Sequence, residues 1–278
     1  MSVTTEIQSF VNQFYNIMAK RFFCIDTHTF DAKQEVISRT SIWLAKKRYA
    51  QCIIYEEGSL IKNHKISEDK RNEYIFDTKG NVIGRLEVKG IDIVRTSFPA
   101  KFREFMSVFV KDLLRGDSRE KLDEDILTFK ESIKTLDVIS IAKNTSVKFI
   151  SKDGEINYNP ESRKPFQMIK GAPAQVKACI YYNDLLDKWQ LEKNVEPIHH
   201  GQKIKWVYVK DNEFGMDCIA MKADGNDPER MMDFINKYID RNAMFEKELV
   251  SKLKDFYNVF SWQFPNTSMK VAAQFFDF

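Results

Sequence analysis

Near residue 96 the spacing of the apolar residues changes from a pattern typical of β-strands to one typical of α-helices. The pattern is β-like from residue 34 to 57 and again from 76 to 94. Within the second segment, Lys79-Gly80-Asn81 has the composition of a hairpin turn. These segments predict a small antiparallel sheet that ends before residue 96.

Helices are predicted on both sides of this sheet. Thr4 and Thr5 are good capping residues, and the apolar residues behind them recur at helical spacing, which predicts an amphipathic helix over residues 4–22. The run from Thr96 to Pro99 marks the start of another helix, which Gly116 ends. Further helices are predicted at 118–135, 174–188, 228–239 and 241–258, and a strand within 199–210. We therefore expect an α+β fold, β-rich before residue 96 and mainly helical after it.

The composition indicates a folded chain without a general attraction for nucleic acid. A chain of 278 residues with 43% hydrophobic residues can bury a sizeable core. Its 43 lysines and arginines against 40 acidic residues leave a net charge of only +3. Any anion-binding surface must therefore be local.

The cysteines and histidines do not predict a metal site. The four cysteines, Cys24, Cys52, Cys179 and Cys218, lack the CxxC pairing of structural zinc sites and are interpreted as reduced thiols. His199 and His200 are adjacent, with no carboxylate or cysteine at ligand spacing. No stretch reaches 18 apolar residues, and the N-terminus lacks the pattern of a signal peptide. The expected compartment is the cytoplasm.

Three consecutive cations and a tyrosine, Lys46 to Tyr49, lie between two apolar runs that resemble β-strands. One interpretation is an edge strand that its lysines protect from aggregation. The other is a phosphate-binding site, in which a stiff strand holds cations at fixed spacing against successive backbone charges.

A second stretch favours the phosphate-binding interpretation. The segment "EVKGIDIVRTS" places Lys89 and the flexible Gly90 shortly before Arg95, Thr96 and Ser97. These residues lie at a strand end and a helix start, where donors and free backbone N–H groups favour anions. Two such sites in one small sheet suggest a track for a polyanion.

These two stretches resemble the palm-to-thumb region of family B DNA polymerases, especially those of T-even-like bacteriophages. "KKRYA" is followed about forty residues later by "KGIDIVRTSFP", and the similarity continues in order. "DVISIAK" at 137–143 looks like the family's thumb strand, and "GAPAQVKACIYYN" at 171–183 and "FGMDCIA" at 214–220 are similar to other thumb segments. The terminal "QFFDF" is similar to the clamp-binding tail of the phage enzymes.

The resemblance implies a domain arrangement and a set of duplex-binding residues. Residues 1–96 would be the C-terminal portion of the palm, 97–265 the thumb with a small β element, and 266–278 a tail that binds a sliding clamp. The expected DNA-binding residues are Lys46, Lys47, Arg48, Tyr49, Lys89, Gly90, Arg95, Thr96, Ser97, Lys177 and Tyr182. For Tyr182, a half-buried position on a helix is the alternative.

The catalytic motifs of the family are missing. The family holds two magnesium ions with aspartates of an "SLYPS"-type motif and a "DTDS" motif, and neither motif occurs in this sequence. The resemblance therefore implies the C-terminal subunit of a split polymerase, inactive alone. A partner chain would supply the metal-binding aspartates, the fingers and the exonuclease, and would hold most of the Mg²⁺ and dNTP contacts. A recombinant or proteolytic fragment is the other explanation.

The resemblance also assigns supporting roles. Glu35 would assist the metal site from its periphery, unless it is simply an exposed strand glutamate. The apolar stripe of helix 4–22 would pack partly against the partner chain. Phe275, Phe276 and Phe278 would enter an apolar pocket on a clamp, unless the tail docks into its own core. A viral origin would make the compartment the host cytoplasm.

Two other functions remain open at this point. The chain could be a non-enzymatic DNA-binding or clamp-binding accessory protein with a polymerase-like thumb. It could also be an unrelated α+β protein whose matches arise by chance. In the second case, charge reversal at Lys46 and Lys47 leaves the affinity for DNA unchanged.

Overall fold

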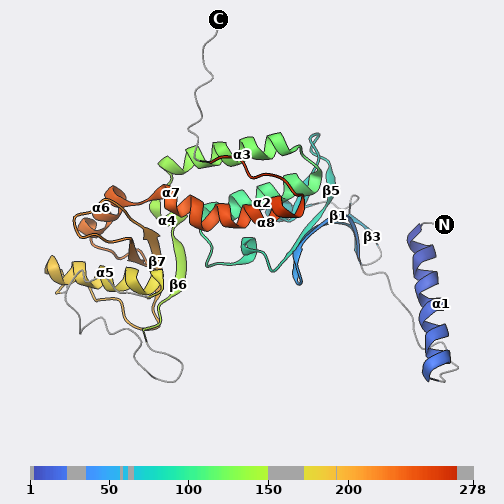
Figure 1. Ribbon diagram of the computed structural model, residues 1–278, viewed down its shortest axis with the longest axis horizontal. Helices are drawn as coiled ribbons and strands as arrows, with labels where there is room; N and C mark the ends of the chain where they lie inside the picture. The colour runs from blue at the N-terminus through green and yellow to red at the C-terminus, as the bar shows by residue number, and fades with distance from the viewer. Residues whose placement is uncertain are drawn as a thin grey trace, which may run out of the picture. The chain divides into compact units, whose positions relative to one another are not determined.

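The computed structural model describes residues 3–23, 36–56, 59–61, 66–149, 172–191 and 193–267 (Figure 1). The fold class is α+β, as predicted. The backbone divides into two compact units, the first formed by Met1–Ser41 with Ala50–Glu87 and the second by Ile42–Tyr49 with Val88–Phe278. The second unit therefore includes the stretch from residue 88 to 96, which lies before the boundary expected from the sequence.

The long N-terminal helix is confirmed. Helix α1 spans Val3–Phe23, in close agreement with the predicted range of 4–22. Several of its large apolar side chains are exposed to solvent, among them Phe10, Phe14 and Ile17.

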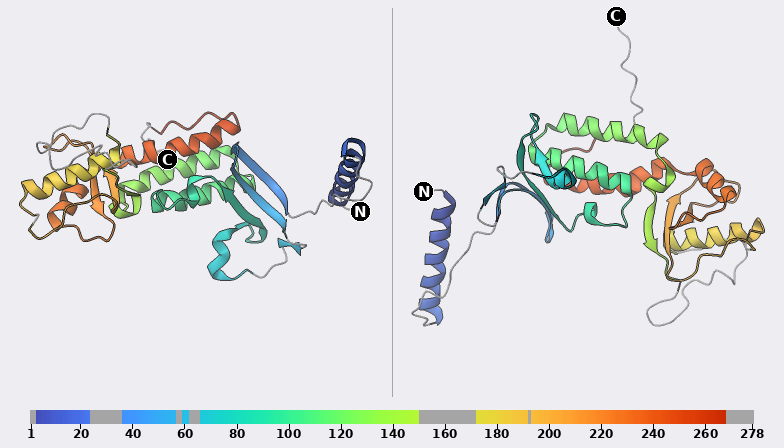
Figure 2. Two further views of the ribbon diagram at one scale, coloured as in Figure 1. Left: turned by 90° about the horizontal axis from the view of Figure 1, so that it is seen from below. Right: turned by 180° about the vertical axis from the view of Figure 1, so that it is seen from behind.

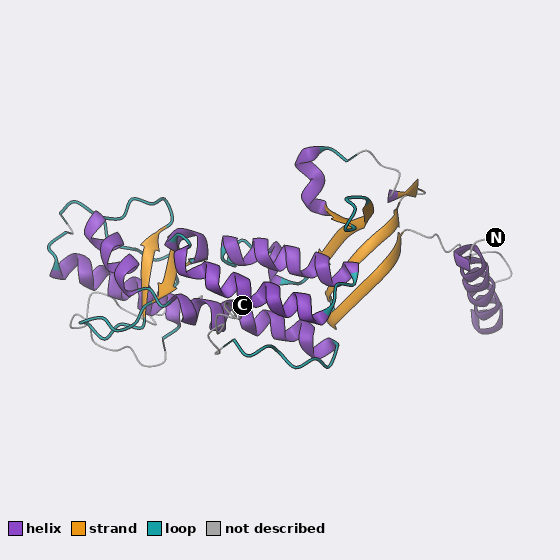
Figure 3. Cartoon of the chain, turned by 90° about the horizontal axis from the view of Figure 1, so that it is seen from above, coloured by secondary structure: helices purple, strands orange, loops and turns teal. Residues whose placement is uncertain are grey.

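A five-stranded sheet follows α1 in the chain. Four strands are hydrogen-bonded in the order β1 (Val36–Ala45), β2 (Arg48–Glu56), β5 (Val82–Lys89) and β4 (Tyr74–Phe76), and the short β3 (Ser59–Leu60) pairs with β2. A 3₁₀ helix at Glu68–Glu73 precedes β4. Figure 3 shows the three long strands of this sheet side by side.

The predicted hairpin turn between β4 and β5 is confirmed. Strands β4 and β5 pair in antiparallel fashion, and the turn between them contains Lys79, Gly80 and Asn81. The Asp77 carboxylate accepts hydrogen bonds from the backbone N–H groups of Lys79 at 2.9 Å and Asn81 at 2.8 Å. Gly80 has φ of +82°, in the left-handed region that glycine adopts readily.

The second unit contains the two helices predicted after Pro99. Helix α2 spans Ala100–Arg115 and ends at Gly116, whose φ of +94° closes the helix in the left-handed conformation. Helix α3 spans Arg119–Ser132, and the Ser118 side chain caps it by accepting a hydrogen bond from the Lys121 backbone. A 3₁₀ turn at Ile133–Thr135 extends α3.

The strand expected at 137–143 is wrong for most of its length. Residues Val138–Ile141 form a single helical turn, α4. The Asp137 side chain caps this turn by accepting a hydrogen bond from the backbone of Ser140 at 3.2 Å. A strand, β6, begins only at Lys143 and ends at Ser146.

The helix predicted at 241–258 forms one continuous segment with an irregular middle. Helix α7 (Arg241–Met244) leads into a π-helix at Phe245–Val250 and then into α8 (Ser251–Val259). The Phe109 ring of α2 lies 5.8 Å from the ring of Phe256 and 6.3 Å from that of Tyr257 on α8. Helices α2, α3 and α8 lie side by side in both views of Figure 2, and their aromatic side chains form the core between them.

A smaller three-stranded sheet completes the second unit. Its strand order is β6, β7 (Lys203–Tyr208) and β8 (Cys218–Lys222), all antiparallel, so the predicted strand within 199–210 is confirmed. Helix α5 (Ala174–Lys188) packs on β8, and α6 (Glu229–Tyr238) follows that strand in the chain. Among the described helices, none has the length and apolar character needed to cross a membrane.

Candidate nucleic-acid interface

The two central lysines of the basic stretch lie in a turn. Lys46 and Lys47 connect β1 to β2, and Lys47 has φ of +63°. The expectation that a stiff strand carries all four residues is therefore corrected, because the chain reverses direction at this point. Both lysines are exposed, and neither forms an ion pair with a residue in the described part of the chain. We call Lys46 and Lys47 the basic turn.

Gly90 lies directly against the basic turn. It follows β5 with φ of +68°, and a Cβ atom placed on it would lie 2.2 Å from the Lys47 carbonyl oxygen and 3.0 Å from Cγ of Arg48. A real Cβ cannot approach a backbone oxygen this closely, so only glycine fits. The fold thus brings together the two stretches that the sequence indicates as anion sites. Lys89, the exposed residue before Gly90, ends β5 beside the turn.

Arg48 and Tyr49 begin strand β2, and each is held by a specific partner. Arg48 Nη2 donates to the Asp255 carboxylate on α8 at 2.8 Å, and 37% of the Arg48 side chain remains exposed. The Tyr49 ring lies 4.7 Å from the ring of Trp43, which is itself 59% exposed. The start of β2 therefore presents a fixed guanidinium and an aromatic pair beside two solvated ammonium groups.

The residues from 91 to 97 form a polar corner before α2. A 3₁₀ turn at Asp92–Val94 buries the Asp92 carboxylate, which forms ion pairs with Arg95 at 3.1 Å and with Lys252 of α8 at 3.2 Å. Thr96 and Ser97 are exposed, and their carbonyl oxygens accept hydrogen bonds from Asn144 at 3.1 and 3.2 Å. This corner combines an exposed cation with two exposed hydroxyl groups.

Two other expected binding residues lie on α5, and their side chains are occupied by contacts within the protein. Lys177 forms an ion pair with Asp217, and only 18% of its side chain is exposed. Tyr182 is fully buried, and burial raises the pKa of its hydroxyl, with the Asp227 carboxylate adding to the effect. Full burial goes beyond the half-buried alternative considered from the sequence. In this conformation, the Tyr182 side chain has no surface to offer a ligand.

The remaining expected site residues lie outside the described part of the chain. Glu35 belongs to this group, as do Phe275, Phe276 and Phe278.

Sequence reasoning missed the acidic residues that hold the interface cations. Asp255 and Asp92 are the partners of Arg48 and Arg95, and Lys252 bridges Asp92 to α8. The sequence offers a local signal for a paired acid at Asp92, because this residue lies between two isoleucines. Asp255 carries none, since 207 positions separate it from Arg48.

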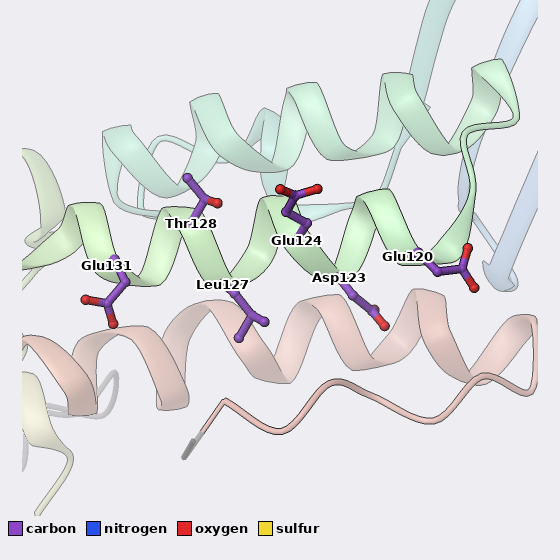
Figure 4. A pocket seen from close by; sticks show the side chains of 6 residues that line it. All are labelled: Glu120, Asp123, Glu124, Leu127, Thr128 and Glu131. Atoms are coloured by element: carbon purple, nitrogen blue, oxygen red, sulfur yellow. The ribbon is translucent and has the colours of Figure 1, made fainter. Parts of the chain in front are cut away.

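An open groove on α3 differs in charge from the basic turn. Its volume is about 610 Å³, and Figure 4 shows the six side chains that line it along α3. These are Glu120, Asp123, Glu124, Leu127, Thr128 and Glu131. Four carboxylates repel phosphate, so we exclude this groove from the anion-binding surface.

The described residues do not gather the ligands that a pair of magnesium ions requires. Within the described ranges, no group of three or more histidines, cysteines, aspartates or glutamates is placed to hold a metal ion. Comparison with models of known protein families found no match, and comparison with curated proteins found none either.

Proposed function

We propose that this chain is the C-terminal subunit of a split family B DNA-directed DNA polymerase, and that it grips the primer–template duplex. The main support is the contact between Lys47 and Gly90, which places the basic turn beside the stretch from Lys89 to Ser97. The ordered resemblance of these segments to the palm-to-thumb region of the family supports the same function.

The arrangement suits binding to a nucleic-acid backbone without regard to sequence. Ammonium and guanidinium groups neutralise phosphates and release counterions, so the affinity depends on salt and only weakly on base sequence. A polymerase moves along its product and needs contacts of this kind. The small net charge of +3 agrees with a local grip rather than with general attraction.

In the proposed division of labour, a partner chain carries the chemistry. The partner supplies the metal-binding aspartates, the fingers and the exonuclease, and holds most of the Mg²⁺ and dNTP contacts. Primer extension joins the primer 3′-hydroxyl to the α-phosphate of the nucleotide and releases pyrophosphate. The tail at 266–278 binds a sliding clamp and thereby raises the local concentration of the enzyme at the primer end.

A second candidate function is a non-enzymatic DNA-binding or clamp-binding accessory protein. The same basic turn favours this function equally, because it explains duplex binding without any chemistry. The two candidates differ in one respect, which is whether a partner chain with the missing aspartates restores primer extension.

The test reverses the charge of the basic turn. We expect Lys46→Glu with Lys47→Glu to weaken binding to a short primer–template duplex, measured by fluorescence anisotropy over a series of salt concentrations. The slope of log K against log salt should fall by about 0.9 for each phosphate that the variant no longer neutralises. The matched control is Lys79→Glu, which reverses an exposed lysine in the hairpin turn between β4 and β5.

Primer extension is then measured with the chain alone and with a partner that carries the missing aspartates. We expect extension only from the pair. Unchanged duplex affinity in the double variant would exclude the basic turn as a grip. Duplex binding without any extension from the pair would leave the accessory protein as the function.

A further inference from the structure

Helix α8 makes charged contacts with both parts of the candidate interface. Its Asp255 accepts a hydrogen bond from Arg48 Nη2 at 2.8 Å, at the start of β2. One turn earlier, Lys252 reaches the buried Asp92 carboxylate at 3.2 Å. Because residues three apart lie on the same face of a helix, one face of α8 holds both the start of β2 and the corner before α2.

The Asp92 carboxylate is shared between two cations. One oxygen faces Lys252, and the other faces Arg95 at 3.1 Å. The Arg95 side chain is 61% exposed, whereas that of Asp92 is 12% exposed. Asp92 therefore links the guanidinium of an exposed arginine to Lys252 of α8.

The contact with Asp255 leaves most of the Arg48 guanidinium for another acceptor. A guanidinium has five N–H donors in a rigid fork, and the bond to Asp255 uses one of them. An arginine at the end of a turn would otherwise sample many rotamers, and binding would have to immobilise it. An arginine already held by a carboxylate loses less freedom when it binds phosphate.

We propose that Asp255 is a positioning residue for duplex binding, which orients Arg48 so that its remaining donors meet a backbone phosphate. Lys252 acts in the same way on Arg95 through Asp92. This inference rests on the proposed function, and it adds the residues that give the grip its geometry.

The proposal and simple electrostatics predict opposite results for Asp255→Ala. A carboxylate near the duplex repels phosphate, so its removal should tighten binding if charge alone matters. Positioning predicts that binding to the short primer–template duplex weakens about two- to tenfold, the range expected when one long side chain must be immobilised on binding. The salt slope should stay nearly unchanged, because Arg48 still neutralises its phosphate once it is immobilised.

Three comparisons separate positioning from a structural role. Glu104→Ala is the matched control, because it removes an acid that forms an ion pair with Lys101 at 2.7 Å on α2, and it should not weaken binding. In Arg48→Ala, the further change Asp255→Ala should cause no additional decrease in affinity. Asp255→Asn keeps the shape of the side chain and should weaken binding less than Asp255→Ala does, and it serves as the test variant if the alanine variant does not fold.

Each outcome decides the inference. Unchanged or tighter binding by Asp255→Ala overturns it, as does weaker binding that Asp255→Ala causes equally in the Arg48→Ala background. If Lys46→Glu with Lys47→Glu weakens binding while the Asp255 variants do not, only the positioning role fails. If the unmodified chain does not bind duplex at all, the proposed function and the inference fail together.

Discussion

The close approach of Gly90 to the basic turn gives a quantitative prediction for Gly90→Ala. The substitution adds a single methyl group, and two independent effects oppose it. Gly90 has φ of +68°, a conformation that costs a residue with a side chain about 1–2 kcal/mol. The added Cβ would also lie 2.2 Å from the Lys47 carbonyl oxygen, so the turn or the end of β5 must shift. Such overpacking typically costs about 1–3 kcal/mol.

Gly80→Ala separates these two effects. Gly80 also lies in a turn with positive φ, +82°, but a Cβ placed on it has no atom within 4 Å. We expect Gly80→Ala to show the conformational cost alone, and Gly90→Ala to show that cost and the overpacking together. The free energy of unfolding should therefore fall by about 1–3 kcal/mol more for Gly90→Ala than for Gly80→Ala.

Thermal unfolding followed by circular dichroism measures this difference, since 1 kcal/mol corresponds to about 2–4 °C in a domain of 150–250 residues. Duplex binding supplies a second readout, because the displaced basic turn should weaken binding in Gly90→Ala, whereas binding by Gly80→Ala should be unchanged. Equal melting temperatures for the two variants would refute the close approach, and with it the main support for the proposed interface.

Two further predictions concern the helical core and the turn between α2 and α3. Phe109→Ala should lower the free energy of unfolding by about 3–5 kcal/mol in a urea titration, because the Phe109 ring is buried against Phe256 and Tyr257, and a small effect would exclude this packing. Hydrogen bonds from Arg115 and Lys121 hold the pKa of Asp117 below its ordinary value, so its stabilising contribution is complete above that ordinary value, near 3.8, and is lost as the pH falls toward the lowered one. Asp117→Asn should therefore destabilise the chain at pH 7 and reduce the loss of stability between pH 4 and the lowered pKa, and an unchanged acid profile would contradict the assignment.

The helices could be predicted because their signals are local. Pro99 and Gly116 lie just before the start and just after the end of α2, and the apolar residues between them have helical spacing. The same reasoning located α1, α5 and α6 to within about two residues. Where a start signal, a stop signal and a periodic apolar stripe agree, a helix can be predicted without knowledge of its tertiary contacts.

The basic turn could not be predicted because it lacks the usual turn residues. Tight hairpins favour Asn-Gly or Asp-Gly, which accept positive φ easily, but here Lys47 takes that conformation. The apolar runs on both sides therefore predict one strand region interrupted by charge. At 137–143 the structure differs from the expected strand for a local reason. Asp137 is a good N-cap, and it starts the short helix α4 in place of a strand.

The candidate site shows a more general limit of local reasoning. The resemblance to the polymerase family makes Lys177 and the lysines of the basic turn equal candidates for DNA binding. The structure distinguishes them by their partners. Lys177 on α5 forms an ion pair with Asp217, while Lys46 and Lys47 are exposed beside Gly90. Only 18% of the Lys177 side chain is exposed and its charge is paired with a carboxylate, so removing it disturbs packing before it disturbs binding. Substitutions in the basic turn therefore report on ligand binding, whereas those at Lys177 report first on the contact between α5 and β8.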